Sequence, residues 1–147
     1  MLQFDDAWYE EWKRKMEESG GNVILALGIR PLEETEKRTV MEMPYGPNVR
    51  QGTGVFAAGP LIQLADVAAT VACREAMERM FPEEPRTFPL CVQINAHLVR
   101  NTDRGKAISE TRLIHAGRTM MVAESEVKDD QGRLLATVTG TYLVSRG

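Results

Sequence analysis

The chain has 147 residues, of which 43% are hydrophobic and 27% are charged, a composition typical of one globular domain with a single core. A net charge of −3 lacks the positive footprint of a phosphate binder, so we expect no nucleic-acid partner. The first residues are acidic and amphipathic, and no apolar run is long enough to cross a bilayer. We therefore expect a cytoplasmic protein with no signal peptide and no membrane partner.

The first predicted element is a helix over residues 7–18, with Asp5 or Asp6 as its cap and Gly20 at its end. Its aromatic residues and Met16 form an apolar stripe that we expect to dock on the domain. We interpret residues 1–20 as a helical extension of a single domain that covers residues 1–147.

The central part of the chain predicts a hairpin, a loop and a long helix. Residues 28–43 read as two extended segments, and residues 44–54 are rich in Pro, Gly and Asn, which is typical of a loop. A helix of about twenty residues follows over 60–81, with Gly59 as its N-cap and Pro60 at its first position.

The last third of the chain predicts four strands. Apolar and polar residues alternate over 90–98, which indicates a strand with one buried face, and turn signals separate further strands over 106–114, 119–128 and 133–144. Short turns between strands favour an antiparallel sheet, so the fold class is α+β: a curved sheet of about six strands around the long helix. Small side chains in the strands would let that helix approach closely, although ordinary strand variation is an alternative.

The long helix carries a narrow polar stripe on an otherwise apolar surface. Its members, spaced three or four residues apart, are Gln63, Asp66, Thr70 and Arg74. Thr70 lies one turn from Asp66 and can donate a hydrogen bond to it. Asp66 is therefore either a core carboxylate satisfied by Thr70 and backbone amides, or a functional carboxylate in a pocket.

Glycines precede this helix, at Gly52, Gly54 and Gly59, so the backbone there can come close to a ligand. Amides at a helix N-terminus bind anions or a developing oxyanion. Asp66 lies ~10 Å further along the helix axis, whereas reacting groups must approach to ~3–3.5 Å. If both features serve one substrate, the amides of one chain act with the carboxylate of another.

The stretch QGTGVFAAGPLIQLADVAATVA, residues 51–72, resembles the signature of hotdog-fold acyl-CoA thioesterases, especially the phenylacetate-degradation type. That signature runs Asn-x-x-Gly-x-x-His-Gly-Gly, then six residues, then Asp or Glu. The strands after residue 90 resemble the closing strands of the same family. The resemblance covers residues 28–144 and leaves the N-terminal helix outside it. It implies a hotdog fold and a homodimer, with a dimer of dimers as a further assembly.

The resemblance implies a role for each matching residue. Asp66 becomes the nucleophile or general base, the amide of Ala58 polarises the thioester carbonyl, and Gln51 orients the carbonyl or the water, with Thr70 one turn after the acid. Ala57 stands where the family has histidine, and Ala58 where it has glycine. We expect the substrate contacts to include Gly59, Ala57, Gln63, Cys73 and, toward the phosphates of coenzyme A, Arg118.

Two functions remain open. The first is hydrolysis of an acyl-CoA thioester, and the second is a non-catalytic hotdog module that binds an acyl or aryl ligand or coenzyme A. The missing histidine favours binding, whereas Asp66, Gln51 and Thr70 favour hydrolysis, because an apolar acyl pocket needs no carboxylate. A hotdog hydratase is a third, weaker option, because this sequence shows none of the Asp-and-His motif of that branch. We expect no cofactor beyond the coenzyme A of the substrate and no metal site, since the two cysteines and two histidines lack ligand spacing.

Overall fold

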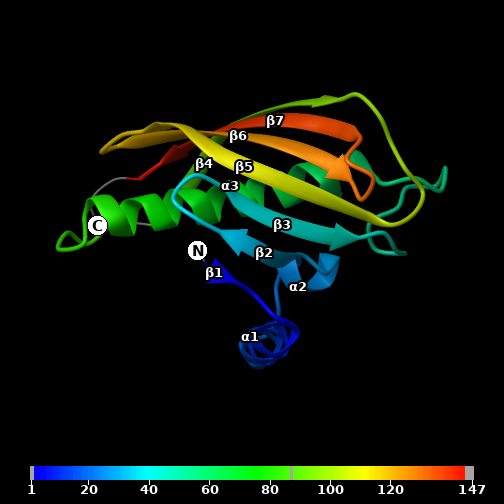
Figure 1. Ribbon diagram of the computed structural model, residues 1–147, viewed down its shortest axis with the longest axis horizontal. Coiled ribbons are helices and arrows are strands. Elements are labelled where there is room, and N and C mark those ends of the chain that lie inside the picture. The colour runs from blue at the N-terminus through cyan, green and yellow to red at the C-terminus, as the bar shows by residue number, and fades with distance from the viewer. Residues whose placement is uncertain (1, 87, 145–147) are drawn as a thin grey trace.

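The computed structural model describes residues 2–86 and 88–144. One long helix, α3 (Ala58–Met80), lies against a curved antiparallel sheet (Figure 1). The sheet has seven strands in the order β1-β2-β3-β5-β6-β7-β4. Their bounds are β1 (Leu2–Gln3), β2 (Arg30–Glu34), β3 (Thr39–Pro44), β4 (Leu90–Leu98), β5 (Lys106–Ala116), β6 (Met120–Asp129) and β7 (Leu134–Leu143). The α+β class and the hotdog arrangement expected from the resemblance are confirmed.

The predicted strands match the observed ones to within a few residues, and the differences have local causes. The helix α3 starts at Ala58, with Ala57 as its cap, so it begins two residues before the predicted Pro60. Two short elements were not predicted: β1, and the helix α2 (Val23–Leu27). Asn22 caps α2, and Gly28 ends it with a φ of 71°, but five residues are too few for a periodic signal.

Small side chains line the seam between α3 and the sheet, as the strand composition indicated. Those of the strands are buried and include Ala107, Ser109, Thr111, Ala123, Ser125 and Ala136. The hydroxyl oxygens of Ser109 and Thr111 lie 3.2 Å apart, and those of Thr111 and Ser125 lie 2.7 Å apart, so these polar groups satisfy one another. On the helix side the seam is filled largely by alanines and leucines, among them the fully buried Ala68. Close approach of helix and sheet therefore depends on small residues.

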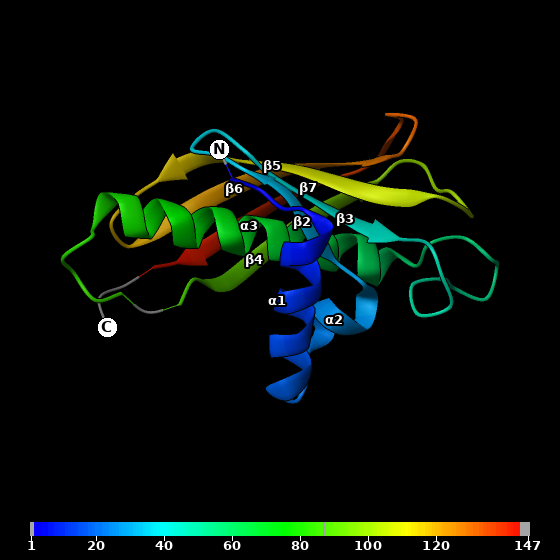
Figure 2. The ribbon, with the colours of Figure 1, turned by 60° about the horizontal axis from the view of Figure 1, so that its bottom comes forward.

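The N-terminal helix α1 (Asp6–Glu18) is capped by Asp5, whose side chain accepts a hydrogen bond of 2.8 Å from the Trp8 amide. Figure 2 shows that α1 runs across the direction of α3 rather than along the sheet. The expected docking of this stripe on the domain is partial: no residue of α1 is fully buried and Trp8 is 39% exposed, whereas Trp12 and Met16 are half-buried. The stripe forms the wall of a cleft described below.

Strand β4 forms an edge of the sheet, and its predicted buried face is open in the single chain. Val92, Ile94 and Leu98 are 51%, 38% and 43% exposed. The alternation of apolar residues holds from Ile94 to Leu98, but a register shift between Cys91 and Gln93 breaks it, so that Leu90 pairs with the exposed Leu143. The helix α3 packs mainly on β5 and its neighbours rather than on β4. Within the described residues, no helix has the length and apolar character needed to span a membrane.

We predict that Ala68→Leu destabilises the fold by about 1–3 kcal/mol, because the seam has no space for three more carbons. Urea unfolding measures the change. Ala7→Leu, on the exposed surface of α1, is the matched control and should change the free energy of unfolding little. An Ala68→Leu protein as stable as the parent would show that the seam can widen.

Candidate active site

The loop before α3 is held at both ends, which sets the position of the helix start. Phe56 is buried and meets the Tyr45 ring edge to face, at a centroid distance of 5.3 Å. Its backbone carbonyl accepts from Asn101 Nδ2 at 2.9 Å, and its amide donates to the Thr102 carbonyl at 3.1 Å. Gly54 has a φ of 88°, a conformation that glycine adopts without steric cost.

The first turn of α3 presents backbone amides that no side chain caps. Its cap residue, Ala57, is extended (φ −71°, ψ 149°) and makes no side-chain capping bond. Ala58 and Gly59 are exposed. No non-glycine residue in the described ranges has a positive φ, so alanine fits at position 58 without backbone strain. The alanine that replaces the family's glycine thus leaves this helix terminus regular.

Asp66 is half-buried, and its carboxylate is held by a residue of the sheet. The hydroxyl of Tyr142, on β7, donates a 2.8 Å hydrogen bond to Asp66 Oδ1. Burial raises the pKa of Tyr142, and the nearby Asp66 charge raises it further, so the hydroxyl remains a donor. Sequence analysis named Thr70 as the donor and missed Tyr142. Its only sequence signal is a hydroxyl-bearing aromatic residue in the last strand.

A cleft of about 820 Å³ opens beside Asp66, between α3 and α1. The polar stripe of α3 lies along it, since Gln63, Asp66, Thr70 and Arg74 all contribute to its lining. The remaining lining is mostly apolar and comes from α1, α2, β2, β3 and α3 itself. Gln63, Asp66 and Thr70 are half-buried along this cleft, and Arg74 is exposed.

The other predicted site residues lie apart from Asp66 within one chain. Ala57, Ala58 and Gly59 are at the helix start, ~12 Å along the axis from Asp66. Gln51 is exposed on the preceding loop, where its Nε2 donates to Thr53 Oγ1 at 2.8 Å. Arg118 lies beyond the far end of α3, 3.3 Å from Glu84 and over the Phe81 ring. A role for Arg118 at phosphates stays a prediction.

Residues 54–136, more than half of the chain, match the family model of the thioesterase superfamily. The chain belongs to this superfamily. Among its relatives, a proposed esterase of Deinococcus radiodurans is 34% identical over 113 residues, covering 77% of this chain and 67% of that protein. The proposed esterase ComA2 of Bacillus subtilis is 32% identical and covers 83% of this chain and 93% of its own.

Solved structures of thioesterases show the same fold. A mutant of the thioesterase PA1618 from Pseudomonas aeruginosa has a TM-score of 0.80 at 19% identity and covers all of both chains. The thioesterase HI1161 from Haemophilus influenzae has a TM-score of 0.79 at 22% identity, over 99% of this chain and 96% of its own. At these identities the likeness establishes the fold.

The two cysteines of this superfamily member lie under Asp66 rather than in the cleft. Cys73 is fully buried in a cluster with Tyr142 and Met121 and does not line the cleft, so its contact with a substrate stays a prediction. Burial, with smaller contributions from Cys91 and Asp66, raises the pKa of Cys73 to about 12. The pKa of Cys91 is also raised by burial. Both thiols therefore remain protonated and are poor nucleophiles at neutral pH.

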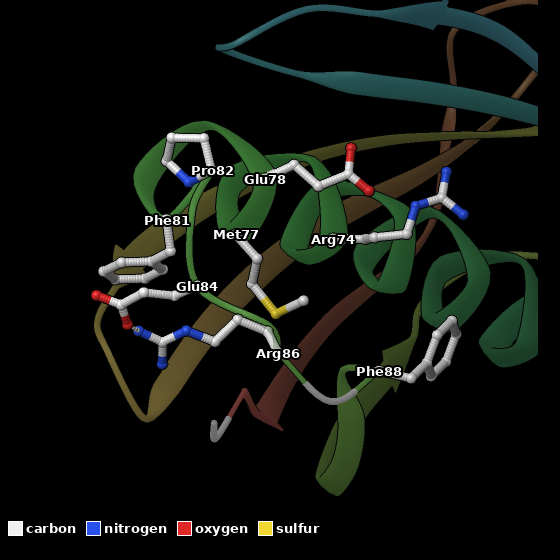
Figure 3. A pocket seen from close by; sticks show the side chains of 8 residues that line it. All are labelled: Arg74, Met77, Glu78, Phe81, Pro82, Glu84, Arg86 and Phe88. Atoms are coloured by element: carbon white, nitrogen blue, oxygen red, sulfur yellow. Dashed lines mark hydrogen bonds and ion pairs between the residues drawn. The ribbon is translucent and has the colours of Figure 1, made fainter. Parts of the chain in front are cut away.

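A second cavity, of about 500 Å³, lies at the C-terminal end of α3 (Figure 3). The Arg86 guanidinium lies 3.8 Å from the centroid of the Phe81 ring and 2.7 Å from a Glu84 oxygen. It also donates to the backbone carbonyls of Arg118 and Val144, at 2.7 and 3.3 Å. These contacts anchor the segment after α3 to the ends of β6 and β7, which is a structural role.

Sequence analysis also missed a pair of carboxyl groups at the edge of the larger cleft. Glu34 of β2 and Glu75 of α3 both line it. Burial, and then the charge of Glu75, raises the pKa of Glu34 from 4.5 to about 7. Arg74, 3.5 Å from Glu75, opposes the shift only in part. Residues 41 positions apart in sequence give no local signal of such a pair.

We predict that Glu34→Gln stabilises the protein at pH 8 by about 1 kcal/mol, once solvent screening is allowed for, and less at pH 5. The folded-state pKa of about 7 lies above the ordinary 4.5, so the folded protein holds this proton more tightly. The stability that this tighter proton binding adds to the folded state is complete below pH 4.5 and is lost as the pH rises through 7. Thermal unfolding at both pH values measures it, with the exposed Glu36→Gln as control. Equal effects at both pH values would contradict the raised pKa.

Proposed function

We propose that this protein hydrolyses acyl-CoA thioesters at a site formed between two copies of the chain. The observation that carries the proposal is Asp66, a carboxylate held by the Tyr142 hydroxyl at 2.8 Å and placed on the wall of a largely apolar cleft. A carboxylate in such surroundings serves as a base or nucleophile better than a solvated one. Relatives support a CoA thioester as substrate, since one from Escherichia coli, 26% identical over 132 residues, is named 1,4-dihydroxy-2-naphthoyl-CoA hydrolase.

The reaction follows one of two balanced courses. Asp66 attacks the thioester carbonyl carbon and forms an anhydride that water then hydrolyses, or it takes a proton from the water that attacks. In both courses the carbon–sulfur bond breaks, coenzyme A leaves as a thiolate that is then protonated, and the oxygen that water supplies ends in the carboxylate products. The amide of Ala58 would donate to the carbonyl oxygen as charge develops there. Gln51 and Thr70 would orient the carbonyl or the water, as the resemblance implies.

Two features support assembly of the site from two copies. Asp66 is ~12 Å along the helix axis from the Ala58 amide, too far for both to act on one carbonyl group. The open apolar face of β4 lies on an unpaired sheet edge, which can pair with the same edge of a second copy. The partner would cover the apolar side chains and bring its own helix start toward Asp66. A homodimer is thus the smallest active unit, and pairing of dimers is compatible with it.

A non-catalytic module that binds an acyl ligand is the second candidate. It is favoured by Ala57, which places a methyl group where the family has a histidine. Against it stands the tethered carboxylate of Asp66, because an unreactive apolar pocket gains nothing from a charge on its wall. Activity measurements on the Asp66 variants distinguish the two.

We predict that Asp66→Asn lowers acyl-CoA hydrolysis by a factor of ~100 or more, because the amide neither attacks nor accepts the proton. Asp66→Ala should have the same effect, and both variants should remain dimeric by light scattering. The control, Glu78→Gln, removes an exposed charge from the same helix and should retain activity. An Asn variant with the parental rate would make Asp66 structural, and a parent that binds but does not hydrolyse acyl-CoA would establish the binding module.

We predict that Ile94→Asp converts the dimer to a monomer, because a charge on the apolar face of β4 would be buried at the interface. Hydrolysis should fall with the dimer fraction. Asn95→Asp places the same charge on the opposite face of the same strand, opposite Thr139, and should leave the dimer intact. A dimeric, active Ile94→Asp protein would place the interface elsewhere.

A further inference from the structure

The helix α1 lies outside residues 54–136, which match the superfamily, yet it forms one wall of the Asp66 cleft. The chain has two tryptophans, Trp8 and Trp12, and both belong to this wall. Met16 continues it, so the contributing positions recur every four residues on one face of α1. A helix outside the matched residues thus lines the cleft with its largest side chains.

The rings of this wall are arranged against one another. Phe4 and Trp8 have centroids 4.3 Å apart, and Trp8 and Trp12 are stacked at 6.2 Å with an interplanar angle of 14°. They are not packed into a core, since α1 has no buried residue. Exposed aromatic surface gains free energy when an apolar ligand covers it.

The facing wall connects these rings to the reactive carboxylate. Val67 and Val71 of α3 line the cleft beside Asp66 and Thr70. Ile29, just before β2, and Met41 of β3 also contribute to the lining. A group that begins at a carbonyl near Asp66 and extends into this cleft therefore lies between aliphatic side chains and tryptophan rings.

Surface contacts hold α1 in place. Asp6 forms a 2.9 Å ion pair with Arg30 of β2, whose guanidinium also lies 4.6 Å from the centroid of the Tyr9 ring. After α1, Gly20 and Gly21 have φ values of 99° and 73°, a backbone conformation suited to glycine. The wall is anchored by these surface contacts, and none of the residues of α1 is fully buried.

We propose that α1 selects the acyl group: Trp8 and Trp12 contact the large apolar acyl groups of thioester substrates, whereas small acyl groups do not reach the two rings. This inference rests on the proposed function and adds the determinant of substrate choice. It concerns the acyl part of the substrate, which enters the cleft from the Asp66 side.

Intrinsic fluorescence gives a direct test, because every tryptophan of the chain is on this wall. Benzoyl-CoA and decanoyl-CoA, added to the Asp66→Asn dimer to prevent turnover, should shift or quench the emission, whereas acetyl-CoA and coenzyme A should not. The two large thioesters also distinguish an aryl ring from an alkyl chain as the better occupant. An emission spectrum unchanged by both large thioesters, at concentrations that saturate hydrolysis by the parent, would overturn the proposal.

Kinetics provides the second test. Trp12→Ala should lower the kcat/KM ratio of benzoyl-CoA or decanoyl-CoA to acetyl-CoA by about tenfold or more, and Trp12→Phe should restore much of it. Glu10→Ala, on the exposed side of α1, should leave the ratio unchanged, and circular dichroism should show all three variants folded. An unaltered ratio in folded Trp12→Ala overturns the proposal. If the parent hydrolyses no thioester, the proposed function fails, and fluorescence titration of the parent with the same thioesters still decides whether α1 contacts the acyl group.

Discussion

The hydrogen bond between Tyr142 and Asp66 joins the last full strand to the central helix and determines what that helix presents. A carboxylate on a mostly apolar helix is tolerable only with a hydrogen-bonding partner. Asp66 accepts a hydrogen bond from the Tyr142 hydroxyl, and the cleft lies beside it. The bond is compatible with the rotation of α3 that buries Leu64 and Ala68 against the sheet. With Asp66 held at the sheet, Thr70 and Arg74 lie along the same cleft, and Leu64 and Ala68 face the core. The order of the site follows from this contact.

The elements that local patterns specify were predictable from the sequence. Alternation gave the strand over 90–98, turn residues gave the three strands that follow, and spacings of three and four residues gave the polar stripe of α3, because each of these signals is local in the sequence. Asp66 could be singled out for the same reason. Its partner could not, since Tyr142 lies 76 residues away and reaches it only through the pairing order of the sheet. The Glu34 and Glu75 pair escaped for the same reason.

Two other features depend on what covers a surface rather than on how it is patterned. The alternation in β4 is that of a buried face, and only the sheet order shows that the chain leaves this face open. The stripe of α1 likewise predicted contact with the domain, and the structure places it along a cleft of the domain with its side chains partly exposed. Amphipathic patterns identify a face that avoids water, and the identity of the covering surface is a property of the assembled molecule.

The small residues at the seam of α3 and the sheet have a consequence for which side chains around the cleft can change size. Ala68, Ala107 and Ala123 leave little freedom to enlarge side chains in this seam, so the position of Asp66 is fixed to the scaffold. The aromatic wall is tied to that scaffold only at its surface. The two walls of one cleft therefore differ in how far their side chains can change size: the seam under α3 is closely packed, and α1 is held by surface contacts.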